Sequence, residues 1–265
     1  MIVPSTQTST VTLHVEGIDA GYAGHKVLNS FTPQPLRGGE LIGLLGPNAS
    51  GKSTFIKTLA GVLRPHSGRV WADIDGQRVG GKQLRSAVGY VPQDLPTSAA
   101  LTAFETVLIA ARRATHAGAA TAADMAAATM EELGLAPLAQ SYLGELSGGQ
   151  RQLVAVAQML VTHPRIMLLD EPTSALDLHR QLFLLEQVRN RARQTGAVAL
   201  VAIHDINLAA RFCGELLVMR GGEVLRQGAP ADILSPELID QVYSVYARIL
   251  DDQGVPLISP VVPTN

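Results

Sequence analysis

A short apolar strand, a glycine-rich loop and an amphipathic helix follow one another between residues 41 and 63. Residues 41–45 read LIGLL, a nearly continuous apolar run that is typical of a strand buried on both faces of a sheet. Residues 54–63 place apolar side chains at helical spacing. The loop between them, residues 46–53, reads GPNASGKS and matches the phosphate-binding pattern G-x-x-x-x-G-K-S/T. Because this pattern requires a strand before it and a helix after it, the segment predicts a nucleotide site.

The chemistry of this loop follows from its residue types. Glycines allow the backbone to curl so that successive N–H groups point at one phosphate, and the start of the helix adds partial positive charge. We expect Lys52 to reach the β- and γ-phosphates and Ser53 to offer its hydroxyl to Mg²⁺. The predicted loop residues are Gly46, Pro47, Asn48, Ala49, Ser50, Gly51, Lys52, Ser53 and Thr54. The loop alone does not separate a kinase from a motor or a transporter.

Two carboxylates follow a second apolar strand, at residues 166–169. The strand end allows Asp170 to hold Mg²⁺ while Glu171 faces the nucleotide, where it is the candidate general base for an attacking water. A solvated acidic turn is the alternative, and four apolar residues directly upstream argue against it. A third apolar run, residues 198–203, ends at His204. This histidine is either a γ-phosphate contact or a structural hydrogen-bond partner, and its position alone leaves both open.

The order of apolar patterns predicts the class of fold. Alternation at residues 11–18 indicates an edge or half-buried strand. Further strands are predicted at residues 27–31, 41–45, 70–74, 166–169, 198–203 and 216–219, and later helices at 179–194 and 206–212. Alternating strands and helices predict a parallel sheet with helices on both faces. Between residues 99 and 146 alanine dominates and strand signals vanish, which predicts a helical subdomain. We expect a loop at residues 114–123 and an extended tail at 256–265.

Composition removes several classes of protein. Hydrophobic residues make up 46% and charged residues 17%, which excludes disorder for most of the chain. A formal net charge of -2 argues against a nucleic-acid binder. The single cysteine, Cys213, cannot form an intramolecular disulfide, so the chain is compatible with a reducing compartment. No apolar run approaches the roughly 18 residues that span a bilayer, and residues 1–10 lack the pattern of a signal peptide.

A second helix start suited to an anion occurs at residues 146–150, LSGGQ. Ser147 can cap this helix, and Gly148 and Gly149 leave backbone N–H groups bare. One nucleotide cannot easily use both helix starts of one chain. The pattern therefore suggests two chains paired head to tail.

The LSGGQ segment resembles the signature of ABC-type ATPases, and other motifs follow in that family's order over residues 11–230. Tyr22 resembles the aromatic residue that stacks on adenine, and Gln93, in YVPQD, resembles the Q-loop glutamine. Residues 46–54 resemble Walker A, residues 170–172 Walker B and residues 174–177 the D-loop. His204 resembles the switch histidine, which favours its catalytic interpretation.

The resemblance implies a P-loop NTPase of ABC-cassette type in one domain, residues 1–265. Its parts would be a RecA-like core, an antiparallel β subdomain, a helical subdomain at about residues 95–162 and a tail at about 231–265. The implied catalytic residues are Glu171, His204 and Gln93, the Mg²⁺ residues Ser53, Gln93 and Asp170, and the ATP contacts Tyr22, residues 46–54, Ser147, Gly148, Gly149 and Gln150. One departure is Ala49, where the family commonly has glycine. Alanine there costs on the order of 1 kcal/mol if the position needs a positive φ.

Three shorter stretches, residues 204–211, 227–230 and 251–257, resemble importers of metal chelates such as ferric siderophores, haem and cobalamin. The resemblance implies an ATPase subunit at the cytoplasmic face of the inner membrane. Its partners would be a second copy, a separate polytopic permease and, indirectly, a substrate-binding protein. We expect the permease to dock near residues 101–112, where core packing is the alternative. The competing hypotheses are an exporter ATPase, a soluble ABC-type ATPase of cofactor assembly, and a nucleotide-binding module without catalysis, against which Glu171 and His204 argue.

Overall fold

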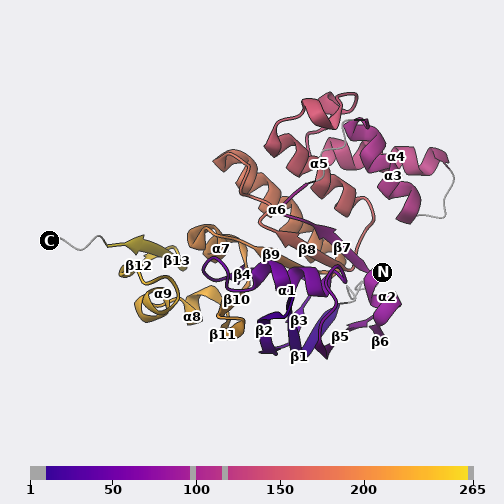
Figure 1. Ribbon diagram of the computed structural model, residues 1–265. Coiled ribbons are helices and arrows are strands. Elements are labelled where there is room, and N and C mark those ends of the chain that lie inside the picture. Colours follow the sequence, from indigo (N-terminus) through magenta and orange to yellow (C-terminus); the bar gives the residue numbers. More distant parts are fainter. Residues whose placement is uncertain (1–9, 96–99, 115–118, 262–265) are drawn as a thin grey trace, which may run out of the picture.

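A six-stranded sheet forms the centre of the molecule in the computed structural model, which describes residues 10–95, 100–114 and 119–261 (Figure 1). Its strand order is β11-β10-β4-β9-β8-β7. The strands are β4 (Leu41–Leu45), β7 (Val88–Val91), β8 (Ile166–Asp170), β9 (Val198–Ala202), β10 (Glu215–Arg220) and β11 (Glu223–Gly228). All neighbouring pairs are parallel except β10 and β11. The predicted parallel sheet is therefore confirmed.

The register of three central strands brings the predicted motifs to one edge of this sheet. Strands β4, β8 and β9 are buried at every position, as their continuous apolar sequences predict. Leu44 of β4 and Asp170 of β8 both pair with Ala202 of β9. The phosphate loop and Glu171 follow β4 and β8 directly, and His204 lies two residues after the end of β9. The parallel arrangement thus places all three at the carboxyl ends of neighbouring strands.

A second, antiparallel sheet packs over one face of the first. Its order is β2-β1-β5-β6, and β3 pairs with β1. The strands are β1 (Thr12–Tyr22), β2 (His25–Phe31), β3 (Leu36–Arg37), β5 (Ser67–Ile74) and β6 (Gln77–Gly80). Strand β1 alternates in burial as predicted, but it pairs on both sides and is not an edge strand. Helix α1 (Lys52–Leu59) joins the two sheets, with Phe55 packed on Phe31 at a ring separation of 4.6 Å.

The remaining helices cover the other face and one side. α5 (Gly148–Leu160), α6 (Leu178–Thr195) and α7 (Ile206–Phe212) share a core with the parallel sheet. α3 (Ala103–Ala114) and α4 (Ala119–Glu132) pack with α5, and Figure 1 shows the three gathered away from the antiparallel sheet. Shorter elements are α2 (Gly81–Ser86), η1 (Ala136–Leu138) and η2 (Leu143–Glu145). Helices lie on both faces as predicted, and one face shares its core with α1, Leu84 of α2 and the second sheet.

One local prediction is wrong, and a second is correct in conformation but did not include the pairing of the strand. The expected loop at residues 114–123 is helical at 119–123, where α4 begins, and its residues 115–118 lie outside the described part. The expected extended tail is extended at residues 256–260, where it forms β13 (Val255–Pro260) and pairs with β12 (Ala247–Asp252) in a hairpin reached through α8 (Pro230–Ile233) and α9 (Pro236–Tyr243). Its last residues, 262–265, are also outside the described part. Across residues 10–95, 100–114 and 119–261, no helix combines the length and apolarity that crossing a membrane requires.

Candidate functional site

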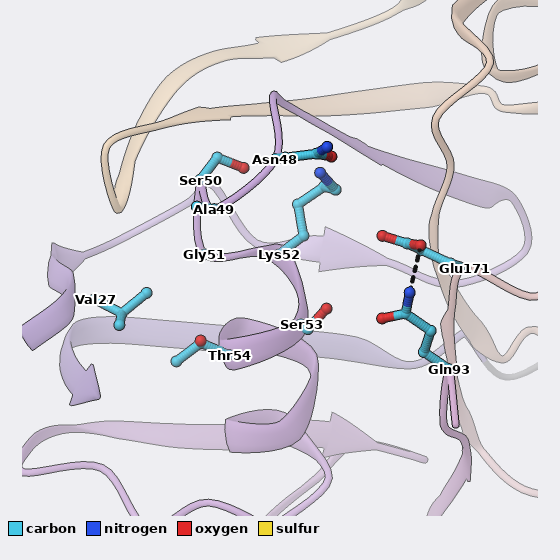
Figure 2. A pocket seen from close by; sticks show the side chains of 10 residues that line it. All are labelled: Val27, Asn48, Ala49, Ser50, Gly51, Lys52, Ser53, Thr54, Gln93 and Glu171. Atoms are coloured by element: carbon cyan, nitrogen blue, oxygen red, sulfur yellow. Dashed lines mark hydrogen bonds between the residues drawn. The ribbon is translucent and has the colours of Figure 1, made fainter. Parts of the chain in front are cut away.

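A cavity of about 390 Å³ lies between the phosphate loop and side chains that follow β7 and β8. Figure 2 shows Asn48 and Lys52 on one side of it and Glu171 and Gln93 on the other. Its lining residues are Val27, Asn48, Ala49, Ser50, Gly51, Lys52, Ser53, Thr54, Gln93 and Glu171. The structure therefore brings together segments that are far apart in the sequence.

Glycines permit the curl of the loop. Gly46 has φ 152°, and a Cβ atom there would lie 2.4 Å from the carbonyl oxygen of Met219. Gly51, with φ 104°, precedes α1 and offers no side chain to cap it. The first N–H groups of α1 therefore face the cavity without a capping oxygen, which suits an anion.

Ala49 also adopts a left-handed backbone, with φ 62°. The sequence predicted strain at Ala49 on the condition that this position needs a positive φ, and the structure shows that it does. An L-residue other than glycine is strained there by about 1 kcal/mol. The loop keeps its curled form despite this strain.

Lys52 is buried within the loop. Its Nζ atom donates to the carbonyl oxygens of Gly46 at 2.7 Å and Pro47 at 3.1 Å. Burial lowers the pKa of this ammonium group, and the negative charges of Glu171 and Asp170 oppose that effect. The geometry holds a cation at the mouth of the loop, where a phosphate would neutralise it.

Asp170 is fully buried at the end of β8. Its Oδ1 atom accepts a hydrogen bond from Ser53 Oγ at 2.9 Å, while Oδ2 has no hydrogen-bond partner within the described residues. Burial raises the pKa of this carboxyl, and the bond from Ser53 works in the opposite direction. A hydroxyl and a buried carboxylate with one free oxygen are ligands that fit Mg²⁺. No group of three His, Cys, Asp or Glu residues in the described ranges could hold a metal, so such an ion would also need phosphate or water oxygens.

Glu171 connects the ends of three strands. Its Oε1 atom lies 2.6 Å from His204 Nε2, and its Oε2 atom accepts a hydrogen bond from Gln93 Nε2 at 2.9 Å. The Glu171 backbone has φ 52°, a left-handed turn directly after Asp170. Asp170 thus stays buried beside Ser53 while Glu171 lines the cavity. This carboxylate can accept a proton from a water held between it and a phosphate.

The LSGGQ residues lie elsewhere. Ser147 caps α5: its hydroxyl accepts from the Gln150 N–H at 3.3 Å, and Gln150 Oε1 accepts from the Ser147 N–H at 2.8 Å. A Cβ atom on Gly149 would lie 3.0 Å from the carbonyl oxygen of Ala175, so this helix start packs on the D-loop segment. None of residues 147–150 lines the phosphate-loop cavity. One chain therefore does not bring the LSGGQ helix start into the phosphate-loop cavity.

Tyr22, at the end of β1, is 46% exposed and also lies outside the cavity lining. Sequence reasoning missed Val27, which lines the cavity although the sequence predicted only a strand at residues 27–31. Tyr243 of α9 does not line the cavity, although it lies near the Gly46 backbone. Burial raises the pKa of Tyr243 to about 12, and the adjacent Gly46 backbone opposes this effect. No motif could have indicated either residue, since both depend on tertiary packing.

The segment expected to meet a permease is largely internal. Val107 and Ala111 of α3 belong to the core, and Phe104 and Leu108 pack against it. For these four residues the structure favours core packing, which was the alternative to a permease contact. Leu101, in contrast, lines a cavity of about 170 Å³ that lies over α5.

Comparison with known proteins gives consistent results. The family model described as ABC transporter matches residues 34–174. The chain is 34% identical over 261 residues to the ferric enterobactin transport ATP-binding protein FepC of Escherichia coli (strain K12), covering 96% of this chain and 95% of that protein. It is 34% identical over 235 residues to the hemin import ATP-binding protein HmuV of Bradyrhizobium diazoefficiens, covering 84% and 85%. A solved dimeric ATP-binding cassette in a post-hydrolysis state, bound to ADP and Pi, matches with a TM-score of 0.73 and 25% identity, covering 82% of this chain and 98% of that one.

Proposed function

This chain belongs to the ABC transporter family, and we propose that it powers uptake of a siderophore-type iron chelate through a separate membrane permease. As a family member it has the ABC cassette fold and is an ATPase. The observation that supports catalysis in this chain is the contact of Glu171 with both Gln93 and His204 at the edge of the phosphate-loop cavity.

In the proposed reaction, a water attacks the γ-phosphorus of ATP. A new P–O bond forms, the bond from this phosphorus to the β-phosphate oxygen breaks, and the water proton passes to the Glu171 carboxylate. His204 and Gln93 hold this carboxylate through its two oxygens. Lys52 and the N–H groups of the loop stabilise the negative charge on the phosphates.

Mg²⁺ neutralises phosphate charge when it accompanies ATP. Ser53 and Asp170 are the residues proposed to hold it, because their oxygens lie together and Asp170 Oδ2 lacks a hydrogen-bond donor within the described residues. The bond between Gln93 and Glu171 places this glutamine at the cavity edge as well. Gln93 is the third proposed Mg²⁺ residue.

We further propose that two copies pair head to tail. The Ser147 and Gly149 backbone would then meet the γ-phosphate held by Lys52 of the other copy. This proposal is supported by the position of residues 147–150 outside their own chain's cavity, and by the similarity to a dimeric cassette.

Tyr22, exposed at the end of β1, is proposed to stack on adenine.

The direction of transport and its cargo are proposed from the relatives. FepC is named for ferric enterobactin transport and HmuV for hemin import. The proposed partners are a polytopic permease and, through it, a substrate-binding protein, at the cytoplasmic face of the inner membrane. Within residues 101–112, the proposed permease contacts are Leu101 and the exposed Ile109, since Val107 and Ala111 are buried.

Replacement of the proposed base tests the mechanism. Glu171→Gln should bind ATP and form a stable dimer while its turnover falls by about 100-fold or more. Glu223→Gln, an exposed position on β11, is the matched control and should hydrolyse ATP as the unaltered chain does. Unchanged turnover in Glu171→Gln would show that Glu171 is not the base.

A transport assay tests the cargo. Vesicles containing the chain and its permease should take up a ferric siderophore in an ATP-dependent manner, and the Glu171→Gln chain should not support uptake. Haem and cobalamin serve as competing cargoes in the same assay. Uptake of either one in preference to the ferric siderophore would replace the proposed cargo.

A further inference from the structure

The helix after His204 is too short to hold its own position. Helix α7 has seven residues, and helices of this length are unstable in water without tertiary contacts. Asp205 caps it by accepting from the N–H groups of Asn207 at 2.8 Å and Leu208 at 3.0 Å. Since His204 directly precedes this cap, any shift of α7 moves the imidazole relative to Glu171.

The C-terminal hairpin supplies the polar contacts that fix α7. Asn207 forms a two-point pair with one residue of β13: its Nδ2 donates to the Ile258 carbonyl at 3.2 Å, and its Oδ1 accepts from the Ile258 N–H at 2.7 Å. One turn later, Arg211 forms an ion pair with Asp252 at the end of β12. Figure 1 shows the hairpin at the end of the molecule where α7 lies, and α7 packs against β13.

These contacts join two stretches that the sequence singled out separately. Residues 204–211 contain both His204 and Asn207, and residues 251–257 contain Asp252 and the start of β13. The pairing of Asn207 with the backbone of Ile258 gives a physical reason for an asparagine at this place, because an amide is the side chain that both donates to and accepts from a strand.

We propose that Asn207 is a positioning residue for ATP hydrolysis. Through its two bonds to Ile258, the hairpin holds α7 and so keeps His204 Nε2 on the Glu171 carboxylate. The inference rests on the proposed role of Glu171 as the base. The C-terminal hairpin would then help to position a catalytic side chain, although the hairpin does not line the phosphate-loop cavity.

The test is steady-state kinetics of the full-length chain. Asn207→Ala should lower kcat by about tenfold or more, since a shift of ~1 Å in a catalytic group can cost on the order of 100-fold. The KM for ATP should change less than about twofold, because Asn207 does not touch the loop. Arg211→Ala should act in the same direction but more weakly. Arg248→Ala, exposed on the same hairpin, is the control with unaltered kcat.

A double substitution separates positioning from general damage. In a His204→Ala background, Asn207→Ala should cause no further loss of kcat, since the group through which it acts is gone. An equal fold-loss in both backgrounds would overturn the inference, and so would an unaltered kcat in Asn207→Ala alone. If Asn207→Ala does not fold, Asn207→Asp, which keeps the size but puts a charged carboxylate oxygen in place of the amide donor, serves in the same two comparisons.

A different result would contradict the proposed function itself. Glu171→Gln hydrolysing ATP at the unaltered rate would remove the proposed base and the inference with it. An inactive Glu171→Gln beside a fully active Asn207→Ala would overturn only the role of the hairpin.

Discussion

Ala49 holds a left-handed backbone, φ 62°, in the middle of the phosphate loop. Ala49→Gly should remove about 1 kcal/mol of strain, and the greater freedom of glycine in the unfolded chain offsets part of this gain. We expect the free energy of unfolding to rise by up to about 1 kcal/mol in urea denaturation. Ala60→Gly is the matched control, because its φ of -69° suits alanine and the change should lower stability. Equal effects at both positions would contradict the strain at Ala49.

Asp170 is the second residue that costs the fold stability. Burial raises the pKa of its carboxyl above the ordinary 3.8, so the folded chain holds this proton to higher pH than the unfolded chain does. Stability is therefore lost as the pH rises through the raised pKa. Asp170→Asn, which keeps an oxygen for Ser53, should raise the free energy of unfolding at pH 7 by about 1 kcal/mol and abolish hydrolysis.

The gain in Asp170→Asn should shrink as the pH falls toward 3.8, because the folded chain then binds the proton that removes the buried charge. Chemical denaturation at several pH values between 4 and 7, beside ATPase assays, measures both effects. A variant less stable than the unaltered chain at pH 7 would show that Asp170 is satisfied in the fold without a metal ion.

Among the elements, the antiparallel sheet depends on one carboxylate that joins three strands. Asp19 of β1 accepts from the Ser30 N–H at 2.7 Å and the Ser67 hydroxyl at 2.9 Å, and lies 2.6 Å from Lys26 Nζ. The bond to Lys26, followed by those from Ser30 and Ser67, lowers the pKa of Asp19 to about 2. This stabilisation is present above the ordinary pKa of 3.8 and is lost as the pH falls through about 2.

Asp19→Asn should therefore lower the thermal midpoint at pH 7 and flatten its dependence on pH between 4 and 2. Differential scanning calorimetry over this range measures the effect. Asp232→Asn, at an exposed position on α8, serves as the control. A pH dependence that Asp19→Asn leaves unaltered would assign the acid sensitivity to other groups.

Sequence reasoning succeeded for elements whose pattern is set by burial alone. β4, β8 and β9 are buried on both faces, and their short apolar runs predicted them closely. The extended form of residues 256–260 was predicted, but their pairing with β12 was not, because that pairing depends on a neighbouring strand. The start of α4 was missed because its alanine-rich sequence has little amphipathic pattern.

In the candidate site, too, the features set by local sequence could be predicted and those set by tertiary packing could not. Motifs predicted the phosphate loop, Asp170, Glu171, Gln93 and His204, and the structure brings these residues together. The left-handed backbone of Glu171 and the pair between Asn207 and Ile258 could not be predicted, since each arises from packing between segments distant in the chain.

The whole molecule is proposed to act as a pair of chains, and mixing two inactive chains tests this. Lys52→Ala removes the loop cation and Ser147→Arg blocks the LSGGQ helix start. In a mixed head-to-tail dimer, one of the two sites combines an intact loop with an intact signature. Mixing equal amounts should restore about one quarter of normal turnover, because half of the dimers are mixed and each has one intact site.

Each variant alone, at the same total concentration, is the control and should stay inactive. ATP hydrolysis after mixing and re-equilibration is the measurement. No recovery on mixing, with mixed dimers demonstrated by differently tagged chains, would contradict a site shared between two copies.

The position of β4 between β9 and β10 has a consequence for how the chain is made. β4 leaves the ribosome long before its two neighbours, which span Val198–Ala202 and Glu215–Arg220. Its strand edges stay unpaired throughout that interval, when a nascent chain is open to chaperones and to aggregation. The strand that leads into the phosphate loop therefore gains both of its sheet neighbours only after β9 and β10 have been synthesised.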